Sequence, residues 1–278
     1  MTIYYAIVFL IFGLVFGSFY NVVGYRLPKK ESLAFPSSHC TVCNHKLGPL
    51  ELIPVFSFIF LGGKCKKCKT KISWYYSIFE LLTGLLFMFS YLKFGFSAEC
   101  FISIALASVL IITIISDYKY FIIPDEIIVV GIVLIGIGSF FRGGLGEKFE
   151  LLSAFKDLGL TLLNGILSFG FMFILKLIGD FLFKKESMGG GDIKLMFIIG
   201  MVLGLPTAIA SVFDAISAIY LLDVLLKLNN VITIKKATKK IHLFESVILF
   251  LLSFLFIKNT PNHLFFALLY KLFLYFCQ

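Results

Sequence analysis

The chain has 278 residues, of which 59% are hydrophobic and only 15% are charged, and its mean hydropathy is +0.99. This balance excludes an ordinary soluble domain and indicates a protein that crosses a membrane several times. The net charge of +9 does not call for a nucleic acid partner, because cytoplasmic lysines and anionic lipids account for it.

Apolar runs follow one another along most of the chain. A helix needs about 20 apolar residues to cross a bilayer. Eight runs meet this requirement, near 3–23, 74–92, 98–116, 121–140, 157–183, 193–209, 210–227 and 242–257. The first run lacks the basic region and cleavage site of a signal peptide, so we expect it to be retained as a span. The shorter run 264–277 contains Lys271 and either lies in the interface or crosses imperfectly.

One polar module interrupts the spans. The connection 24–73 carries nine lysines and arginines against two glutamates, and positively charged loops stay in the cytoplasm. The N-terminus is therefore expected outside, and counting spans places the later lysine-bearing turns on the cytoplasmic face. The sequence predicts an α-helical membrane protein with four parts, namely a first span (1–23), this module (24–73), a helix bundle (74–257) and a C-terminal hydrophobic extension (258–278).

The module contains two C-x-x-C pairs separated by 21 residues, and the four cysteines are Cys40, Cys43, Cys65 and Cys68. This spacing is typical of a zinc ribbon, and about 50 residues have too little core to fold well unaided. We expect a closed, structural Zn(II) site, with a redox dithiol pair or free thiols as the alternatives. His39 is a possible ligand but is more simply a surface residue. Cys100 and Cys277 are expected to be buried packing thiols.

Single aspartates stand where apolar segments meet water. Asp117 and Asp192 fall at one membrane face by the span count, and two carboxylates brought together can share a proton and activate a water. The glycines before Asp192 expose a backbone that a substrate strand can approach. Each acid also has a simpler interpretation, because Asp192 can cap the next helix, Asp117 can mark a span end, and Asp125 can be a helix-start acid.

Five further acids lie in or near the predicted spans. Two have a lysine four residues away on the same helix, Asp180 with Lys176 and Asp223 with Lys227, and local pairing explains them. The sequence offers no such explanation for the others, which are Glu80, Asp214 and Glu245.

Several segments in series resemble the type IV prepilin peptidases. The segments are Gly17 to Val23 with Tyr25 to Pro28, the two cysteine pairs, Ile72 to Trp74 with Glu80 to Gly84, the D-x-x-x-x-x-I-P-D stretch from Asp117 to Asp125, and G-x-G-D-x-K-L from Gly189 to Leu195. Together they cover roughly residues 10 to 200. The chain departs from the family in having Tyr75 and Ser77 where an arginine and a proline are usual.

The resemblance implies a bifunctional enzyme of the bacterial inner membrane. Such an enzyme removes the leader of prepilins or type II secretion pseudopilins at the cytoplasmic face and N-methylates the new terminus with S-adenosylmethionine. By the same resemblance Asp117 and Asp192 are the catalytic pair. Supporting or substrate-binding roles would fall to Gly189, Gly190, Gly191, Asp125 and Lys194.

Two other functions remain as alternatives. A peptidase without methyl transfer, as in preflagellin peptidases, is disfavoured because those relatives resemble only the aspartate half of the chain. A proton-coupled transporter with a regulatory zinc module predicts functional acids near the bilayer midplane, whereas Asp117 and Asp192 fall at span ends. The pilin substrates, the methyl-donor site and the oligomeric state do not follow from the sequence.

Overall fold

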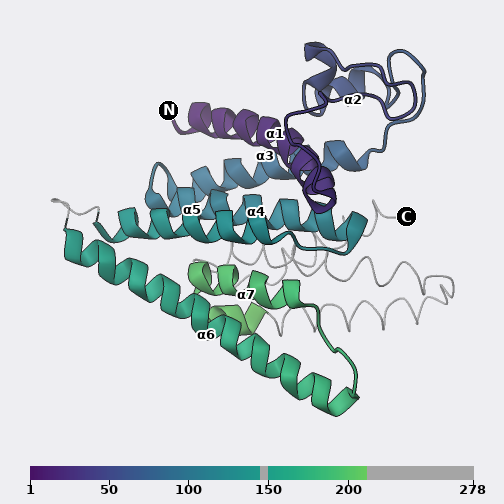
Figure 1. Cartoon of the computed structure of the whole chain (residues 1–278). Helices are drawn as coiled ribbons and strands as arrows, with labels where there is room; N and C mark the ends of the chain where they lie inside the picture. Colours follow the sequence, from purple (N-terminus) through teal and green to yellow (C-terminus); the bar gives the residue numbers. More distant parts are fainter. Residues whose placement is uncertain (145–149, 212–278) are drawn as a thin grey trace, which may run out of the picture. The chain divides into compact units, whose positions relative to one another are not determined.

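The computed structural model describes residues 1–144 and 150–211, and these residues are mostly helical (Figure 1). The elements in chain order are α1 (Thr2–Arg26), the short 3-10 helices η1 (Leu27–Lys29) and η2 (Pro49–Leu52), α2 (Phe56–Phe60), α3 (Tyr75–Phe94), α4 (Ala98–Tyr120), α5 (Asp125–Gly144), α6 (Leu151–Phe183) and α7 (Gly190–Leu203). No β-strand occurs among the described residues, which form only two isolated bridges, both in the module.

Five of these helices are long and apolar enough to cross a membrane, and they are α1, α3, α4, α5 and α6. They correspond to the first five predicted spans. The predicted runs near 242–257 and 264–277 lie outside the described residues, as does 210–227 apart from its first two positions. The full count of eight spans therefore remains a prediction.

The sixth predicted run, 193–209, is not one continuous helix. The α7 helix has 14 residues and ends at Gly204, whose φ of +78° lies in the left-handed region. That conformation suits glycine and stops the helical hydrogen-bond pattern. Pro206 follows two residues later and cannot donate a backbone hydrogen bond.

The α4 helix forms the centre of the described bundle. About 72% of its apolar window is buried, against 22–39% for the other four long helices. Its sequence is apolar on all sides, which is typical of a helix surrounded by others, and it contacts α1, α3, α5 and α7. A residue on α4 is therefore held by neighbours on several sides.

The α1 and α3 helices approach each other very closely. A Cβ added at Gly13 would lie 2.7 Å from the Gly84 Cα atom, and one added at Gly17 would lie 2.7 Å from the Glu80 Cα atom. Small residues spaced four apart allow two membrane helices to pack backbone to backbone. This contact fixes the two helices from which the cysteine module emerges.

Candidate functional site

Asp117 lies in the last turn of α4 rather than in a loop, because the helix continues to Tyr120. Phe121 then adopts the left-handed conformation, and its backbone N–H donates to the Asp117 carbonyl at 2.9 Å. The buried Ser116 hydroxyl donates to the Ile122 carbonyl at 2.5 Å. These bonds fold the chain back immediately after the half-buried Asp117 side chain and fix the turn that leads to α5.

Asp192 occupies the first turn of α7 and is also half-buried. Its carboxylate accepts a hydrogen bond from the Gly189 backbone N–H, which is one of the amides left unpaired at a helix start. Asp192 therefore lies inside the helix that it was expected to cap, and its carboxylate reaches back to the N-cap residue, Gly189. A carboxylate has two oxygens and about four acceptor sites, so one capping bond leaves capacity for a reacting water.

The structure brings the two aspartates together although 75 positions separate them in the chain. The α4 and α7 helices are in contact, and the Asp117 and Asp192 carboxylates interact electrostatically. Gly191 allows this approach, because a Cβ there would lie 2.9 Å from the Ile123 Cβ atom in the turn after α4. The last turn of one helix and the first turn of another therefore present their acids at the same end of the bundle.

The other two glycines have different surroundings. A Cβ at Gly190 would meet nothing within 4 Å, and one at Gly189 would lie 3.4 Å from the Asp192 Oδ2 atom. Packing therefore explains Gly191 alone. The backbone at Gly190 is open on its side-chain face.

Asp125 and Lys194 form an ion pair at the same end, with 2.6 Å between the Lys194 Nζ and Asp125 Oδ1 atoms. The pair joins the first residue of α5 to the second turn of α7. Both side chains are exposed, with relative accessibilities of 68% and 45%, so the pair contributes little to stability. Its geometry orients α7 next to the Asp117 turn.

Asp180 has a different principal partner from the one predicted. Its Oδ1 atom accepts from the Ser187 backbone N–H at 2.6 Å and from the Ser187 hydroxyl at 2.8 Å, and the same hydroxyl reaches the Lys176 carbonyl. The Lys176 ammonium contributes only a weak electrostatic interaction. Asp180 therefore fastens the connection after α6 to α6 itself, just before the glycines that begin α7.

The two cysteine pairs adopt the same backbone geometry. In the first, the Cys40 N–H donates to the His45 carbonyl at 2.9 Å and the Asn44 N–H donates to the Cys40 carbonyl at 2.9 Å. In the second, the corresponding bonds are Cys65 to Thr70 at 2.9 Å and Lys69 to Cys65 at 3.0 Å. An isolated bridge closes each turn, His39 with Lys46 and Lys64 with Lys71. The module is therefore built from two equivalent knuckles.

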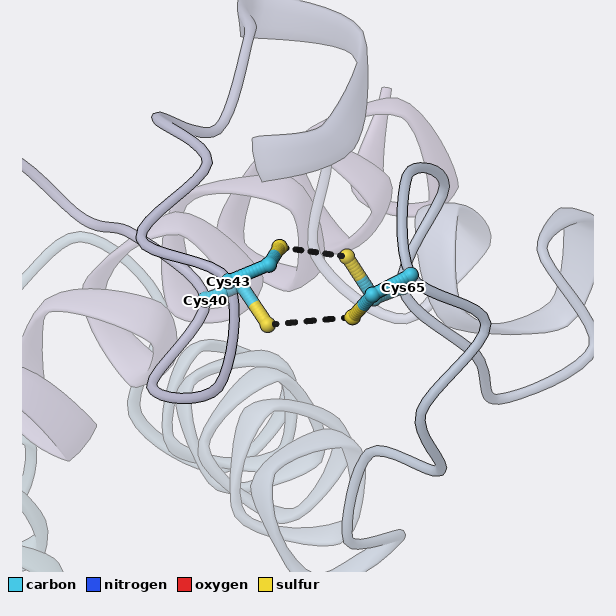
Figure 2. A group of neighbouring side chains, drawn as sticks. Cys40, Cys43 and Cys65 are labelled. Atoms are coloured by element: carbon cyan, nitrogen blue, oxygen red, sulfur yellow. Dashed lines mark hydrogen bonds between the residues drawn. The ribbon is translucent and has the colours of Figure 1, made fainter.

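The four sulfur atoms face one another across the two knuckles (Figure 2). They all lie within 4.8 Å of one another, and the Cys40–Cys68 and Cys43–Cys65 Sγ pairs are 3.7 and 3.9 Å apart. A tetrahedron with metal–sulfur bonds of about 2.3 Å has edges of about 3.8 Å. The spacing fits one four-coordinate ion and is too long for a disulfide. Among the described residues this is the one group of three or more such ligands suited to a metal.

Hydrogen bonds prepare some of these thiols to bind a cation. The Thr70 hydroxyl, 3.2 Å from the Cys68 sulfur, is the main cause that lowers the pKa of Cys68 to about 6. The backbone amide of Cys43 lowers the pKa of Cys40. Thiolates are the form that ligates metals. The His39 Nδ1 atom lies 2.9 Å from the Ser37 carbonyl and is not part of the sulfur group, which agrees with its interpretation as a surface residue.

Two glutamates that the sequence left without a role support this module. Glu51 accepts from the Gly48 N–H at 2.8 Å and lies 3.3 Å from the His45 Nε2 atom, next to the first knuckle. Glu80 accepts from the Val55 N–H at 2.8 Å and also bonds the Ser18 hydroxyl, so it joins the module to α1 and α3. Glu51 follows a Gly-Pro helix start by three positions, a spacing typical of a helix-start acid. No local pattern pointed to the Glu80 contact.

Two family profiles match the chain. The profile of the bacterial peptidase A24 N-terminal domain matches residues 11–94, and that of the type IV leader peptidase family matches residues 104–224. The first covers the module and the α1–α3 contact, and the second covers both aspartates. No solved structure matches the chain.

Curated relatives match over most of the chain. A protein of Bacillus subtilis is 36% identical over 74% of this chain and 77% of its own length. One from Myxococcus xanthus is 35% identical over 72% of this chain and 56% of its own length, and one from Pseudomonas aeruginosa is 29% identical over 80% and 81%. All three carry the name prepilin leader peptidase/N-methyltransferase.

Proposed function

The chain belongs to the type IV leader peptidase family, and from this membership we propose that it cleaves the leader of prepilins or type II secretion pseudopilins and N-methylates the new N-terminus. One observation carries the proteolytic part, namely that α4 and α7 bring Asp117 and Asp192 within electrostatic reach of each other. The substrate classes follow from the family and from the relatives' names.

The helix ends distinguish the two carboxylates. Asp192 lies at the positive N-terminal end of α7 and accepts a backbone N–H, and both features favour its charged form. Asp117 lies at the negative C-terminal end of α4, where a neutral carboxyl is favoured. We therefore assign the shared proton of the resting pair to Asp117.

The reaction then proceeds as acid–base hydrolysis. A water held between the carboxylates gives a proton to Asp192, and its oxygen forms a bond to the scissile carbonyl carbon. Asp117 hydrogen-bonds and then protonates the oxygen that becomes negative. The C–N bond breaks when the amine takes a proton from Asp192 and a hydroxyl group of the tetrahedral intermediate returns its proton to Asp117, which forms the new carboxyl group and restores the pair. The open backbone at Gly190 offers main-chain bonding to an extended substrate segment.

The membrane boundary is a suitable place for this cut. A pilin helix has its backbone hydrogen bonds satisfied inside the bilayer, so the cleaved bond must lie in unwound chain, where water is present. The lysine distribution favours the cytoplasmic face of a bacterial inner membrane. We also propose the four-part division of the chain at 1–23, 24–73, 74–257 and 258–278.

We assign Zn(II) to the sulfur site, held by Cys40, Cys43, Cys65 and Cys68. Four thiolates with tetrahedral spacing and no position left for a water suit a structural ion. Its role is to hold the two knuckles together, since the module has few buried apolar side chains of its own.

S-adenosylmethionine would supply an electrophilic methyl group for the second reaction. The chain has no glycine-rich nucleotide fingerprint, but tyrosine rings from α1, α3 and α4 gather near Asp117 at the same end of the bundle. Tyr25 lies 5.2 Å from Tyr76 and 6.4 Å from Tyr120 between ring centroids. Aromatic faces attract a sulfonium as they attract an ammonium, so these residues fit the donor.

The test is to incubate the full-length protein in nanodiscs with a prepilin and S-adenosylmethionine, and to measure the mass of the product's N-terminus. We expect a shortened chain that carries one added methyl group. A shortened chain without the methyl group would indicate a peptidase alone. Intact prepilin under conditions where a relative cleaves it would contradict the proposal.

A further inference from the structure

The cysteine module contains an apolar segment that nothing in it covers. Residues 52–63 include no charged side chain. Three apolar side chains of this segment are more than half accessible, with Phe56 at 53%, Ile59 at 65% and Phe60 at 84%. A contiguous exposed apolar patch on a polar module marks a binding surface or a membrane contact.

The tether of this segment places it at membrane depth. Val55 begins the turn before α2, and its N–H is bound by Glu80, which also bonds Ser18. Ser18 lies five residues inside the apolar run 3–23, and Glu80 lies six residues inside the run 74–92. At about 1.5 Å per residue, both anchors stand about 8–9 Å within the ends of two membrane-spanning helices. These bonds hold the module next to α1 and α3. Figure 1 shows α2 at the end of the bundle where α1 ends and α3 begins.

The backbone of the segment suits a medium poor in water. The N–H groups of Val55, Ser57 and Ile59 are all donated, at 2.8 to 3.1 Å. Those of Leu61, Gly62 and Gly63 are donated as well, at 2.8 to 3.1 Å. Non-spanning backbone at the membrane boundary must satisfy its polar groups in this way. A run of 10–14 apolar residues is also too short to cross and is typical of an interfacial or re-entrant segment.

The charges next to the segment are complementary to an anionic lipid surface. The second knuckle follows directly and carries five exposed lysines, which are Lys64, Lys66, Lys67, Lys69 and Lys71. Lysines close to an anionic leaflet strengthen binding to it. The same lysines would repel a positively charged protein segment, which disfavours such a segment as the occupant.

We propose that residues 52–63 form an interfacial anchor that inserts α2 into the cytoplasmic leaflet, with Glu80 setting its depth and the knuckle lysines binding anionic headgroups. The metal-binding module then lies on the lipid surface instead of projecting into the cytoplasm. The depth of the module in the membrane would then be fixed at the level where the aspartate pair acts.

The single tryptophan of the chain makes a direct test possible. In a Trp74→Phe background, Phe60→Trp places a probe on the anchor and Val42→Trp places a matched probe on the exposed tip of the first knuckle. Both variants go into nanodiscs of phosphatidylcholine and anionic phosphatidylglycerol, with or without chains brominated near the headgroup. We expect bromolipid to reduce the Phe60→Trp emission by about twofold or more and to leave Val42→Trp largely unchanged.

A second pair of variants tests the tether. Glu80→Leu removes the acceptor for Val55 and should reduce bromolipid quenching, whereas Glu80→Gln retains an acceptor oxygen and should preserve it. Metal content of each variant reports whether the module still folds. Quenching of the Phe60→Trp probe by aqueous acrylamide, with none by bromolipid, would overturn the proposal in favour of a solvated segment. Protection from both quenchers would overturn it in favour of a protein partner, and equal quenching in Glu80→Leu would remove Glu80 from the assignment.

Discussion

The cysteine module and the aspartate end are organised in opposite ways. Each knuckle is built from bonds within six residues of its first cysteine, such as Cys40 to His45, and the two halves meet through sulfur. The two aspartates lie 75 positions apart in the chain. Their approach depends on the contact between α4 and α7 and on the absence of a side chain at Gly191. The comparison teaches that the fold of the module should depend on its metal ion, and the arrangement of the aspartate end on backbone packing.

The largest expected effect on activity comes from the aspartates. Asp117→Asn and Asp192→Asn should each reduce leader cleavage by about 10²–10⁴-fold, because asparagine keeps the volume but cannot exchange the shared proton. The metal content should not change. Glu126→Gln, which removes an exposed acid from the first turn of α5, is the control. Near wild-type cleavage by either aspartate variant would show that the pair is not catalytic.

The next effect should be confined to the module. Replacing Cys40 and Cys43 by serine should release the metal completely and increase proteolysis within residues 24–73, since binding energy at such a site is folding energy. Metal analysis, thiol alkylation and limited proteolysis check this. Cys100→Ser, at a buried cysteine away from the sulfur site, is the matched control. Wild-type protein without metal, prepared free of chelator, would contradict the prediction.

The same module allows methyl transfer to be separated from cleavage. If the N-terminal half completes the methyl-donor site, replacing Cys65 and Cys68 should lower the methylation rate more than the cleavage rate. Equal losses would instead indicate that the module only holds the substrate. The Asp192→Asn variant tests the reverse separation, because it should lose cleavage. We expect it still to methylate a pilin that has been cleaved beforehand.

A smaller effect should separate two adjacent glycines. Gly191→Ala places a Cβ 2.9 Å from that of Ile123 and should cost about 1–3 kcal/mol in stability, with a matching loss of cleavage as α7 shifts. Gly190→Ala meets no atom within 4 Å and should leave stability unchanged. Thermal unfolding and cleavage rates of the two variants decide it. Equal stabilities of the two variants would mean that the contact between Gly191 and the turn after α4 does not limit the packing of α7.

The smallest effect is expected at the ion pair. Asp125→Asn and Lys194→Gln should each change stability by no more than about 1 kcal/mol and keep measurable cleavage, because both side chains are exposed. High salt should reduce the difference from wild type further. A complete loss of cleavage in Asp125→Asn would place that residue in the catalytic machinery.

The sequence predicted those features of the structure that depend on patterns of neighbouring residues. Apolar runs identified five helices that the structure contains, and the C-x-x-C spacing identified the sulfur group. It could not show that Asp180 binds Ser187 instead of pairing with Lys176, because a connection that folds back on its own helix leaves no periodic signal.

Contacts between distant segments were also beyond the sequence. The Glu80 bond to Val55 joins residues 25 positions apart, and the residue types alone indicate neither partner. The Asp125–Lys194 pair spans 69 positions, and only the family resemblance had marked its members. Gly204 and Pro206 form a break signal within the run 193–209, which the prediction of one continuous span did not take into account.

The length of α6 has a consequence for where α7 begins. Its 33 residues extend about 50 Å, whereas the hydrocarbon layer is about 30 Å thick. The uncharged stretch between Asp157 and Lys176 fits that layer, so an α6 helix that crosses without tilting extends beyond it with its final turns. A chain leaving the tip of α6 would otherwise start α7 at that height. Because Asp180 and the Lys176 carbonyl bind Ser187, the connection runs back along α6, and Ser187 lies one to two turns before the end of that helix shortly before α7 begins.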